Sequence, residues 1–105
     1  MIMVDGLKTW SLKPPFHRGS CHLTTDDLTL VELHDFAARL GMRRSWFQDH
    51  PYVPHYDLVP KRRALAVKLG AVEVDAVAQA RKRRARGIGI GLKTWAEVAA
   101  AGGPS

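Results

Sequence analysis

Residues 55–75 read HYDLVPKRRALAVKLGAVEVD, and this stretch decides the fold of the 105-residue chain. Its first four residues predict a short strand, and Pro60 suits the first turn of a helix that continues to about Leu69. Gly70 ends that helix, because glycine readily adopts the left-handed backbone that follows many helices. Residues 71–74 predict another short strand. A strand, a helix and a strand in succession indicate an α/β protein.

Two segments upstream continue this pattern. Residues 1–4 read MIMV and predict a short first strand that ends in a turn. Apolar residues recur every three or four positions over residues 26–40, which predicts a helix that Gly41 ends. Thr24 or Thr25 is expected to cap this helix, with two aspartates favourably placed in its first turn.

Helical signals also dominate the C-terminal part of the chain. Asp75 is a suitable N-cap for a third helix that ends near Arg86. The sequence GIGIG at residues 87–91 predicts a flexible joint. Thr94 and Glu97 have the spacing of a capping box and predict a last short helix.

Length and composition fit one globular domain. The chain is 46% hydrophobic and 25% charged, values that are ordinary for a folded protein. We predict a small single-domain α/β layer fold, in which a sheet of three to four short strands packs with three helices and a short C-terminal helix. Residues 1–86 form the compact α/β domain, and residues 87–105 form the glycine-rich joint and tail.

Cysteine usage and hydropathy point to the cell interior. The single cysteine, Cys21, excludes an intramolecular disulfide and fits a reducing compartment. The N-terminus lacks the pattern of a signal peptide, and no apolar run approaches the roughly 18 residues that a membrane span needs. We therefore expect a soluble cytoplasmic protein without a membrane partner.

The positive charge of the chain is concentrated near its C-terminus. The formal net charge is +6, yet residues 1–80 carry ten Lys/Arg and nine Asp/Glu, whereas residues 81–105 carry six Lys/Arg and one acid. Clustered cations attract polyanions, and nucleic-acid phosphate is the obvious candidate. The alternative is a solvated helix end, where cations are favourable near a C-terminus. The cluster comprises Arg81, Lys82, Arg83, Arg84 and Arg86.

A second candidate region lies in the predicted strand at residues 55–58. His55 and Asp57 are two positions apart, so both side chains face the same side of an extended segment. Tyr56 and Leu58 then enter the core. A carboxylate beside an imidazole orients the ring and raises its basicity, as in general-base pairs and metal sites. The alternative is that Asp57 caps the following helix and His55 is a surface residue.

The residue types near this strand also permit a mixed metal site. A structural zinc site needs paired Cys or His ligands, and one cysteine cannot supply them. Cys21 is expected to be a small buried residue rather than a nucleophile. Histidine and carboxylate ligands suit catalytic divalent metals. The candidate catalytic residues are His22, His55 and Asp57, and the same three with Asp5 are the candidate metal ligands.

Lys61, Arg62 and Arg63 stand in the first turn of the predicted helix, where the helix dipole disfavours positive charge. A local rule broken in this way often marks function. Backbone N–H groups at a helix start, combined with cationic side chains, bind anions such as phosphate. The alternative is a set of surface cations that pair with Asp49 or Asp57.

Short motifs from Val4 to Ala71 stand at a fairly specific combined spacing. They are Val4-Asp5, Cys21-His22-Leu23 with Asp26, Glu32-Leu33-His34 with Phe36-Ala37, Leu40-Gly41, Trp46-Phe47-Gln48, His55-Tyr56-Asp57, and Lys61-Arg62-Arg63-Ala64-Leu65-Ala66-Val67 leading to Gly70-Ala71. Together they resemble a small family of uncharacterised proteins encoded mainly by bacteriophages and actinobacteria. That family has no established activity, so the resemblance implies a fold and a provenance.

Three hypotheses about function follow. The first is a nucleic-acid-associated accessory protein of a phage or mobile element, which binds the phosphate backbone through residues 81–86 and acts in the host cytoplasm if phage-encoded. The second is a small metal- or histidine-dependent phosphoesterase or nuclease. The third is a phage inhibitor or adaptor of a host protein. We favour the first, because the charge cluster is visible in the sequence whereas convergence of the catalytic residues must be assumed.

Overall fold

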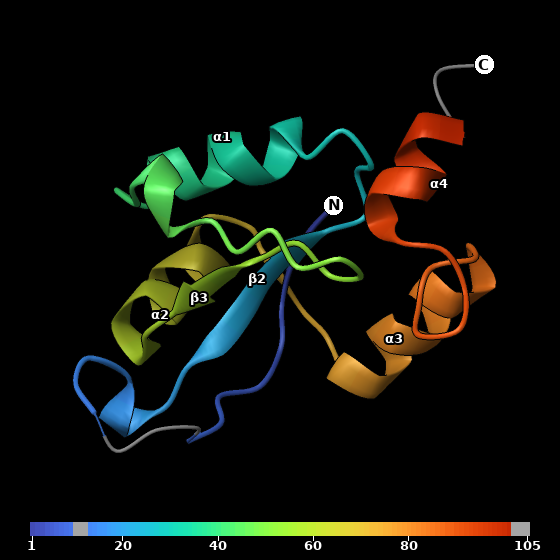
Figure 1. The fold of residues 1–105 in the computed structure, drawn as a ribbon. Coiled ribbons are helices and arrows are strands. Elements are labelled where there is room, and N and C mark those ends of the chain that lie inside the picture. The colour runs from blue at the N-terminus through green and yellow to red at the C-terminus, as the bar shows by residue number, and fades with distance from the viewer. Residues whose placement is uncertain (10–12, 102–105) are drawn as a thin grey trace.

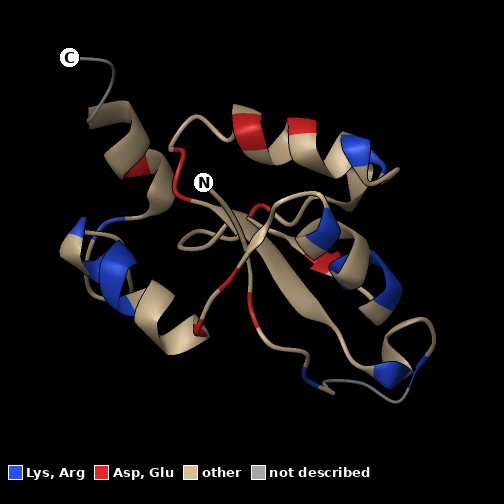
Figure 2. Ribbon diagram, turned by 180° about the vertical axis from the view of Figure 1, so that it is seen from behind, with Lys and Arg blue, Asp and Glu red and all other residues tan. Residues whose placement is uncertain are grey.

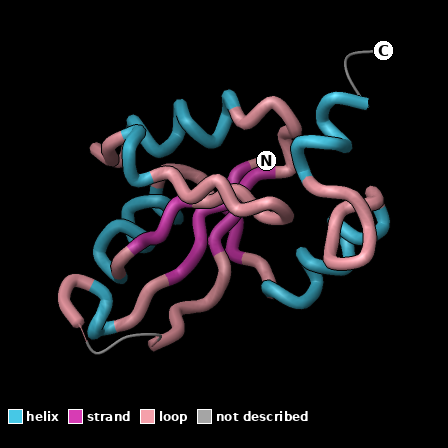
Figure 3. The backbone as a smooth tube through the Cα atoms, viewed as in Figure 1, coloured by secondary structure: helices cyan, strands magenta, loops and turns pink. Residues whose placement is uncertain are grey.

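The computed structural model describes residues 1–9 and 13–101 and has a four-stranded mixed sheet at its centre (Figure 1, Figure 3). The strands are β1 (Ile2–Val4), β2 (Cys21–Thr25), β3 (Tyr56–Leu58) and β4 (Val72–Glu73). They lie in the order β3-β2-β1-β4. β1 pairs antiparallel with β2 and parallel with β4, and β2 pairs antiparallel with β3.

Helices surround this sheet and complete the α/β fold that the sequence predicts. The described residues form helices α1 (Val31–Arg39), α2 (Pro60–Lys68), α3 (Ala76–Ala85) and α4 (Trp95–Ala101), with 3-10 turns at Phe16–Arg18 and Arg44–Trp46. α1 packs on β1 and β2, and α2 packs on β1 and β3. None of these helices reaches the length and apolarity that a membrane span requires, within the described part of the chain.

The hydrophobic core lies between the sheet and helices α1 and α2. Side chains alternate along β2 and β3, so Leu23, Tyr56 and Leu58 point into the core and are at most 1% exposed. Cys21 is buried in the same layer, as predicted. Other members of this core are Ile2, Val4, Leu33, Phe36, Ala37, Leu40, Met42, Ala66 and Ala71.

The opposite face of the sheet carries the alternate residues of the same strands. His22 is the register partner of Asp57 across β2 and β3, and Met3 is the partner of Thr24 across β1 and β2. α3 lies on this side, away from α1 and α2 in Figure 1, and its Arg83 lines a small pocket together with Met3. The side chains of His22 and Asp57 on this face are each 34% exposed.

One predicted element is wrong at its N-terminus. The helix expected over residues 26–40 begins at Val31, and Thr24 and Thr25 are buried strand residues instead of caps. Pairing of these two threonines with β1 outweighs the local capping signal. Asp27 still stabilises the start of α1, because its carboxylate accepts hydrogen bonds from the backbone N–H groups of Thr29 and Glu32.

The remaining predicted elements occur where the sequence places them. Asp75 caps α3 by accepting a hydrogen bond from the N–H of Val77, and Thr94 and Glu97 exchange the two hydrogen bonds of a capping box. Segment 87–91 differs from the flexible joint that the glycines predict, because it forms a hydrogen-bonded turn in which Ile88 is buried. The N–H groups of Trp95 bind the carbonyls of Leu28 and Pro51, which attaches α4 to two distant loops.

Candidate metal centre

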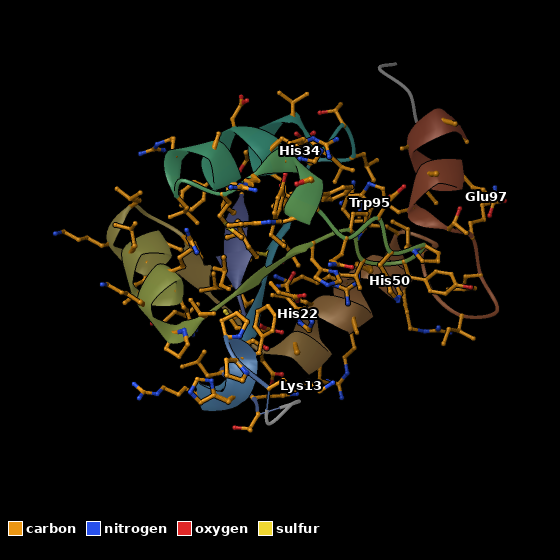
Figure 4. All side chains as sticks on the ribbon, turned by 60° about the vertical axis from the view of Figure 1, so that its left-hand side comes forward. Lys13, His22, His34, His50, Trp95 and Glu97 are labelled. Carbon is orange, nitrogen blue, oxygen red and sulfur yellow. The ribbon has the colours of Figure 1, made fainter. Side chains whose placement is uncertain are left out.

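Strand pairing brings His22, His55 and Asp57 together on the polar face of the sheet. His22 of β2 lies opposite Asp57 of β3, and His55 precedes Asp57 by two positions on the same face. One ligand atom from each residue lies within 4.8 Å of the others, and they are the convergent His/Cys/Asp/Glu group among the described residues. The three candidate catalytic residues therefore share one site. Figure 4 shows that His22, at this site, lies apart from His34 of α1.

The distances within this group are short. His55 Nε2 lies 3.4 Å from Asp57 Oδ1, and the His22 and His55 rings meet edge to face with centroids 4.6 Å apart. The side chains of His22 and Asp57 are each 34% exposed, whereas that of His55 is 12% exposed. The group is thus partly shielded from water yet open on one side.

The Nδ1 atom of each imidazole lies within hydrogen-bond distance of an acceptor oxygen. His22 Nδ1 lies 2.8 Å from Asp5 Oδ2, and the backbone N–H of His22 donates to Asp5 Oδ1 at 2.6 Å. His55 Nδ1 lies 2.8 Å from the carbonyl oxygen of Val53, to which it can only donate. With a proton on Nδ1, each ring would present Nε2 to a metal ion. Such outer acceptors are typical of histidine metal ligands.

Asp5 therefore supports the site from outside the group of converging ligand atoms. Burial by itself raises the pKa of Asp5, but hydrogen bonds from the side chain and backbone of His22 outweigh it and lower the pKa below its usual value. The same side-chain hydrogen bond raises the pKa of His22. His55, through its hydrogen bond, lowers the pKa of Asp57. Both carboxylates are consequently ionised at neutral pH.

His50 is a further imidazole at this site that the sequence did not single out. Its Nδ1 accepts the backbone N–H groups of Tyr52 and Val53, so the neutral ring carries its proton on Nε2. Burial lowers the pKa of His50, and the nearby His55 and Arg83 add to that effect. Its ring centroid lies 6.3 Å from that of His55. The proline-bracketed segment between the two histidines is the sequence signal for this proximity.

The cations at the start of α2 have three different environments. Lys61 is exposed. Arg62 stacks on Trp46, with its guanidinium carbon 5.3 Å from the ring centroid, and lines a pocket together with Asp57. Arg63 donates to the carbonyl of Asp5 at 2.8 Å and pairs with a carboxylate of β4. Arg62 therefore shares a pocket with Asp57, while Arg63 holds the backbone of Asp5, the residue that follows β1.

The cations of the basic cluster at α3 also differ in their environments. Arg84 donates to the carbonyl of Ile90, and Arg86 donates to the carbonyl of Asp26. Arg83 is half-buried, and burial lowers its pKa against the opposing charge of Asp5. Arg81 and Lys82 are exposed. Figure 2 shows the basic positions of α3 and α2 as two separate groups with the sheet between them.

Cys21 takes no part in this chemistry, although it adjoins His22 in the chain. It points into the core with 1% exposure. Burial raises the pKa of its thiol to about 12, so the thiolate is negligible at neutral pH. The thiol is therefore excluded as a nucleophile.

Sequence comparison places these residues within a recognised family. The profile described as "protein of unknown function (DUF4031)" matches residues 6–86. The chain belongs to the DUF4031 family. The DUF4031 segment includes His22, His55 and Asp57 as well as the basic stretch of α3, and it confirms the expected membership of an uncharacterised family. Neither a curated protein nor a solved structure matches the chain.

Proposed function

We propose that this protein is a divalent-metal-dependent phosphoesterase whose metal ligands are His22, His55 and Asp57. The observation that carries this proposal is the convergence of one ligand atom from each residue within 4.8 Å. Two histidines and one carboxylate are a common ligand set for catalytic transition metals, and three protein ligands leave positions for water and substrate. This is the second of the three hypotheses drawn from the sequence.

The outer contacts support the same proposal. Asp5 and the Val53 carbonyl fix the two imidazoles by accepting from their Nδ1 atoms. Such contacts orient a ligand before the metal binds and increase its basicity. His55 Nε2 and Asp57 Oδ1 lie 3.4 Å apart, so a cation held between them would contact both atoms.

The surrounding cations favour an anionic substrate. Arg62 lines the pocket that Asp57 also lines, and the half-buried Arg83 lies close enough to influence the pKa of His50. Burying a guanidinium costs free energy that a bound anion offsets. A phosphate ester suits this environment, because guanidinium groups bind phosphate oxygens through paired N–H donors.

The chemistry follows from these parts. A divalent cation held by His22, His55 and Asp57 would lower the pKa of a bound water and polarise a phosphoryl oxygen. Hydrolysis then forms a P–O bond from that water and breaks the P–O bond to the leaving alcohol, which takes up the proton that the water releases. His50, with its proton on Nε2, is placed beside His55 to donate a hydrogen bond to the phosphate.

The test is metal binding followed by hydrolysis of a simple phosphodiester. Isothermal titration with Zn²⁺ and Mn²⁺ should give one site per chain, and hydrolysis of bis(4-nitrophenyl) phosphate should require that metal. His55→Ala should abolish both metal binding and hydrolysis. His17→Ala, which removes an exposed histidine outside the converging group, should change neither. Hydrolysis that persists in His55→Ala would rule out the proposal.

A second candidate function is nucleic-acid binding through α3, which the exposure of Arg81 and Lys82 favours. Binding of double-stranded DNA should then weaken steeply as salt increases. The double variant Arg81→Glu, Lys82→Glu should lose most of the affinity, whereas Lys68→Glu on α2 should lose little. Salt-independent binding would contradict this function.

We place both functions in the cytoplasm, of the host cell if a phage carries the gene. The buried thiol of Cys21 is compatible with that reducing compartment.

A further inference from the structure

A pocket of about 430 Å³ adjoins the candidate metal centre. Asp57 belongs both to the wall of this pocket and to the group of converging ligand atoms. One bound molecule can therefore occupy the pocket and reach these ligand atoms. The pocket is lined by Pro15, Phe16, Ser45, Trp46, Gln48, Asp57, Val59 and Arg62.

The wall of the pocket combines flat aromatic surface with hydrogen-bonding groups. Trp46 is 41% exposed and lies outside the hydrophobic core, although a large aromatic ring gains from burial. Arg62 stacks on this ring, and Phe16 contributes a second ring to the pocket. Ser45 and Gln48 add a hydroxyl and a side-chain amide, both of which donate and accept hydrogen bonds.

This combination matches the chemistry of a nucleobase. Bases stack on aromatic rings and on guanidinium planes, and their edges form hydrogen bonds with amide and hydroxyl groups. A volume of about 430 Å³ lies within the range of small-molecule pockets. Arg62 and Asp57 line the same pocket, so the guanidinium can neutralise a phosphate attached to the base through a sugar.

We infer that the pocket binds the base of a nucleotide whose phosphate lies at His22, His55 and Asp57. This inference rests on the proposed phosphoesterase function and names its substrate class as a nucleotide or the end of a single nucleic-acid strand. The base determines affinity through Trp46, while the phosphate would contact a metal held by His22, His55 and Asp57.

Isothermal titration of the Mn²⁺-loaded protein tests this inference with adenosine 5′-monophosphate and ribose 5-phosphate. The nucleotide should bind at least about tenfold more tightly, as expected for one stacked base. Trp46→Ala should reduce nucleotide affinity to that of ribose 5-phosphate and leave Mn²⁺ affinity unchanged. Trp46→Phe should retain most of the preference. Equal affinities of the two ligands for the native protein would overturn the inference, as would an unchanged preference in Trp46→Ala.

A separate arm distinguishes failure of this inference from failure of the proposed function. Adenosine has no phosphate, so its binding to the metal-free protein depends on the pocket alone. Tryptophan fluorescence should respond to adenosine in the native protein and in His55→Ala, and not in Trp46→Ala. A response that survives in Trp46→Ala overturns the base pocket. A fluorescence response to adenosine in a native protein that binds no metal would support the base pocket and contradict the phosphoesterase function.

Discussion

The two faces of the sheet use the same strands for opposite purposes. Along β3, Leu58 is completely buried in the core, whereas its neighbour Asp57 is 34% exposed and faces the candidate metal centre. Along β2, Cys21 packs in the core and His22 faces Asp57. Adjacent residues therefore experience unrelated environments, and each polar side chain of the site is anchored by a buried neighbour.

This difference shows how a short sheet can hold a precise site. β3 has only three residues, and the buried side chains of Tyr56 and Leu58, on either side of the candidate ligand Asp57, fix its position. A shift of one residue in register would expose Tyr56 and Leu58 and bury Asp57. The hydrophobic core therefore sets the ligand geometry, and removing core and site residues should have separable consequences.

The largest effect on folding is expected from the core side of β3. Leu58→Ala leaves a cavity at a completely buried position and should lower the free energy of unfolding by about 3 to 4 kcal/mol. Asp57→Asn, one residue away, preserves shape and removes a partly exposed pair, so it should change stability by about 1 kcal/mol or less. Urea unfolding of the metal-free variants measures both values.

Metal affinity should show the reverse order for these two variants. Asp57→Asn removes a ligand and should abolish metal binding, whereas a Leu58→Ala protein that remains folded should still bind. Equal losses of stability in the two variants would contradict the separation of core and site.

A smaller effect is expected from the residue behind His22. Asp5→Asn keeps the shape of the side chain but removes the charge that orients the imidazole, so metal affinity should fall about 10- to 100-fold. Glu73→Gln, which removes a carboxylate that pairs with Arg63, serves as the matched control and should leave metal affinity nearly unchanged. Isothermal titration measures the affinities, and a similar loss in both variants would assign Asp5 a merely electrostatic role.

The smallest effect concerns two histidines that lie on opposite faces. Burial lowers the pKa of His34, which pairs with the hydroxyl of Tyr56 beside the core. The unfolded chain therefore binds a proton at this residue at a higher pH than the folded chain does. The stability provided by neutral His34 is consequently lost as pH falls from about 6.5 through its folded pKa. Asp5 raises the pKa of His22, so its contribution is lost as pH rises from about 6.5 through its folded value.

Unfolding of the metal-free protein between pH 5 and pH 8 tests these opposite signs. The difference in stability between the native protein and His34→Gln should shrink toward acid pH, and the difference for His22→Gln should shrink toward alkaline pH. His17→Gln provides the reference at an exposed site. The same pH trend in both variants would contradict the opposite environments of the two rings.

Local signals were sufficient for most of the fold. Pro60 and Gly70 delimit α2, and Asp75 caps α3, because helix ends depend on a few neighbouring residues. The strand at Cys21–Thr25 escaped prediction, since its threonines and the following aspartates resemble a helix start. Pairing with strands from distant parts of the chain decides that segment, and no local pattern encodes it.

The candidate site was predictable only in part. The spacing of two between His55 and Asp57 indicated a shared face, and the same strand geometry holds in the structure. That His22 lies opposite Asp57 depends on the register of two strands separated by a helix and several loops. The meeting of Trp46 with Arg62 likewise depends on how a 3-10 turn packs against α2.

The sequence by itself determined the α/β class, most element boundaries, the excess of cations near the C-terminus and the residue types that can bind a metal. These properties depend on composition, on periodicity and on hydrogen bonds between near neighbours. Tertiary structure alone decided that His22, His55 and Asp57 converge, that Asp5 lies behind them, and that Arg62 stands beside an aromatic pocket. Contacts of that kind join residues far apart in the chain, and only burial of the common core fixes their distances.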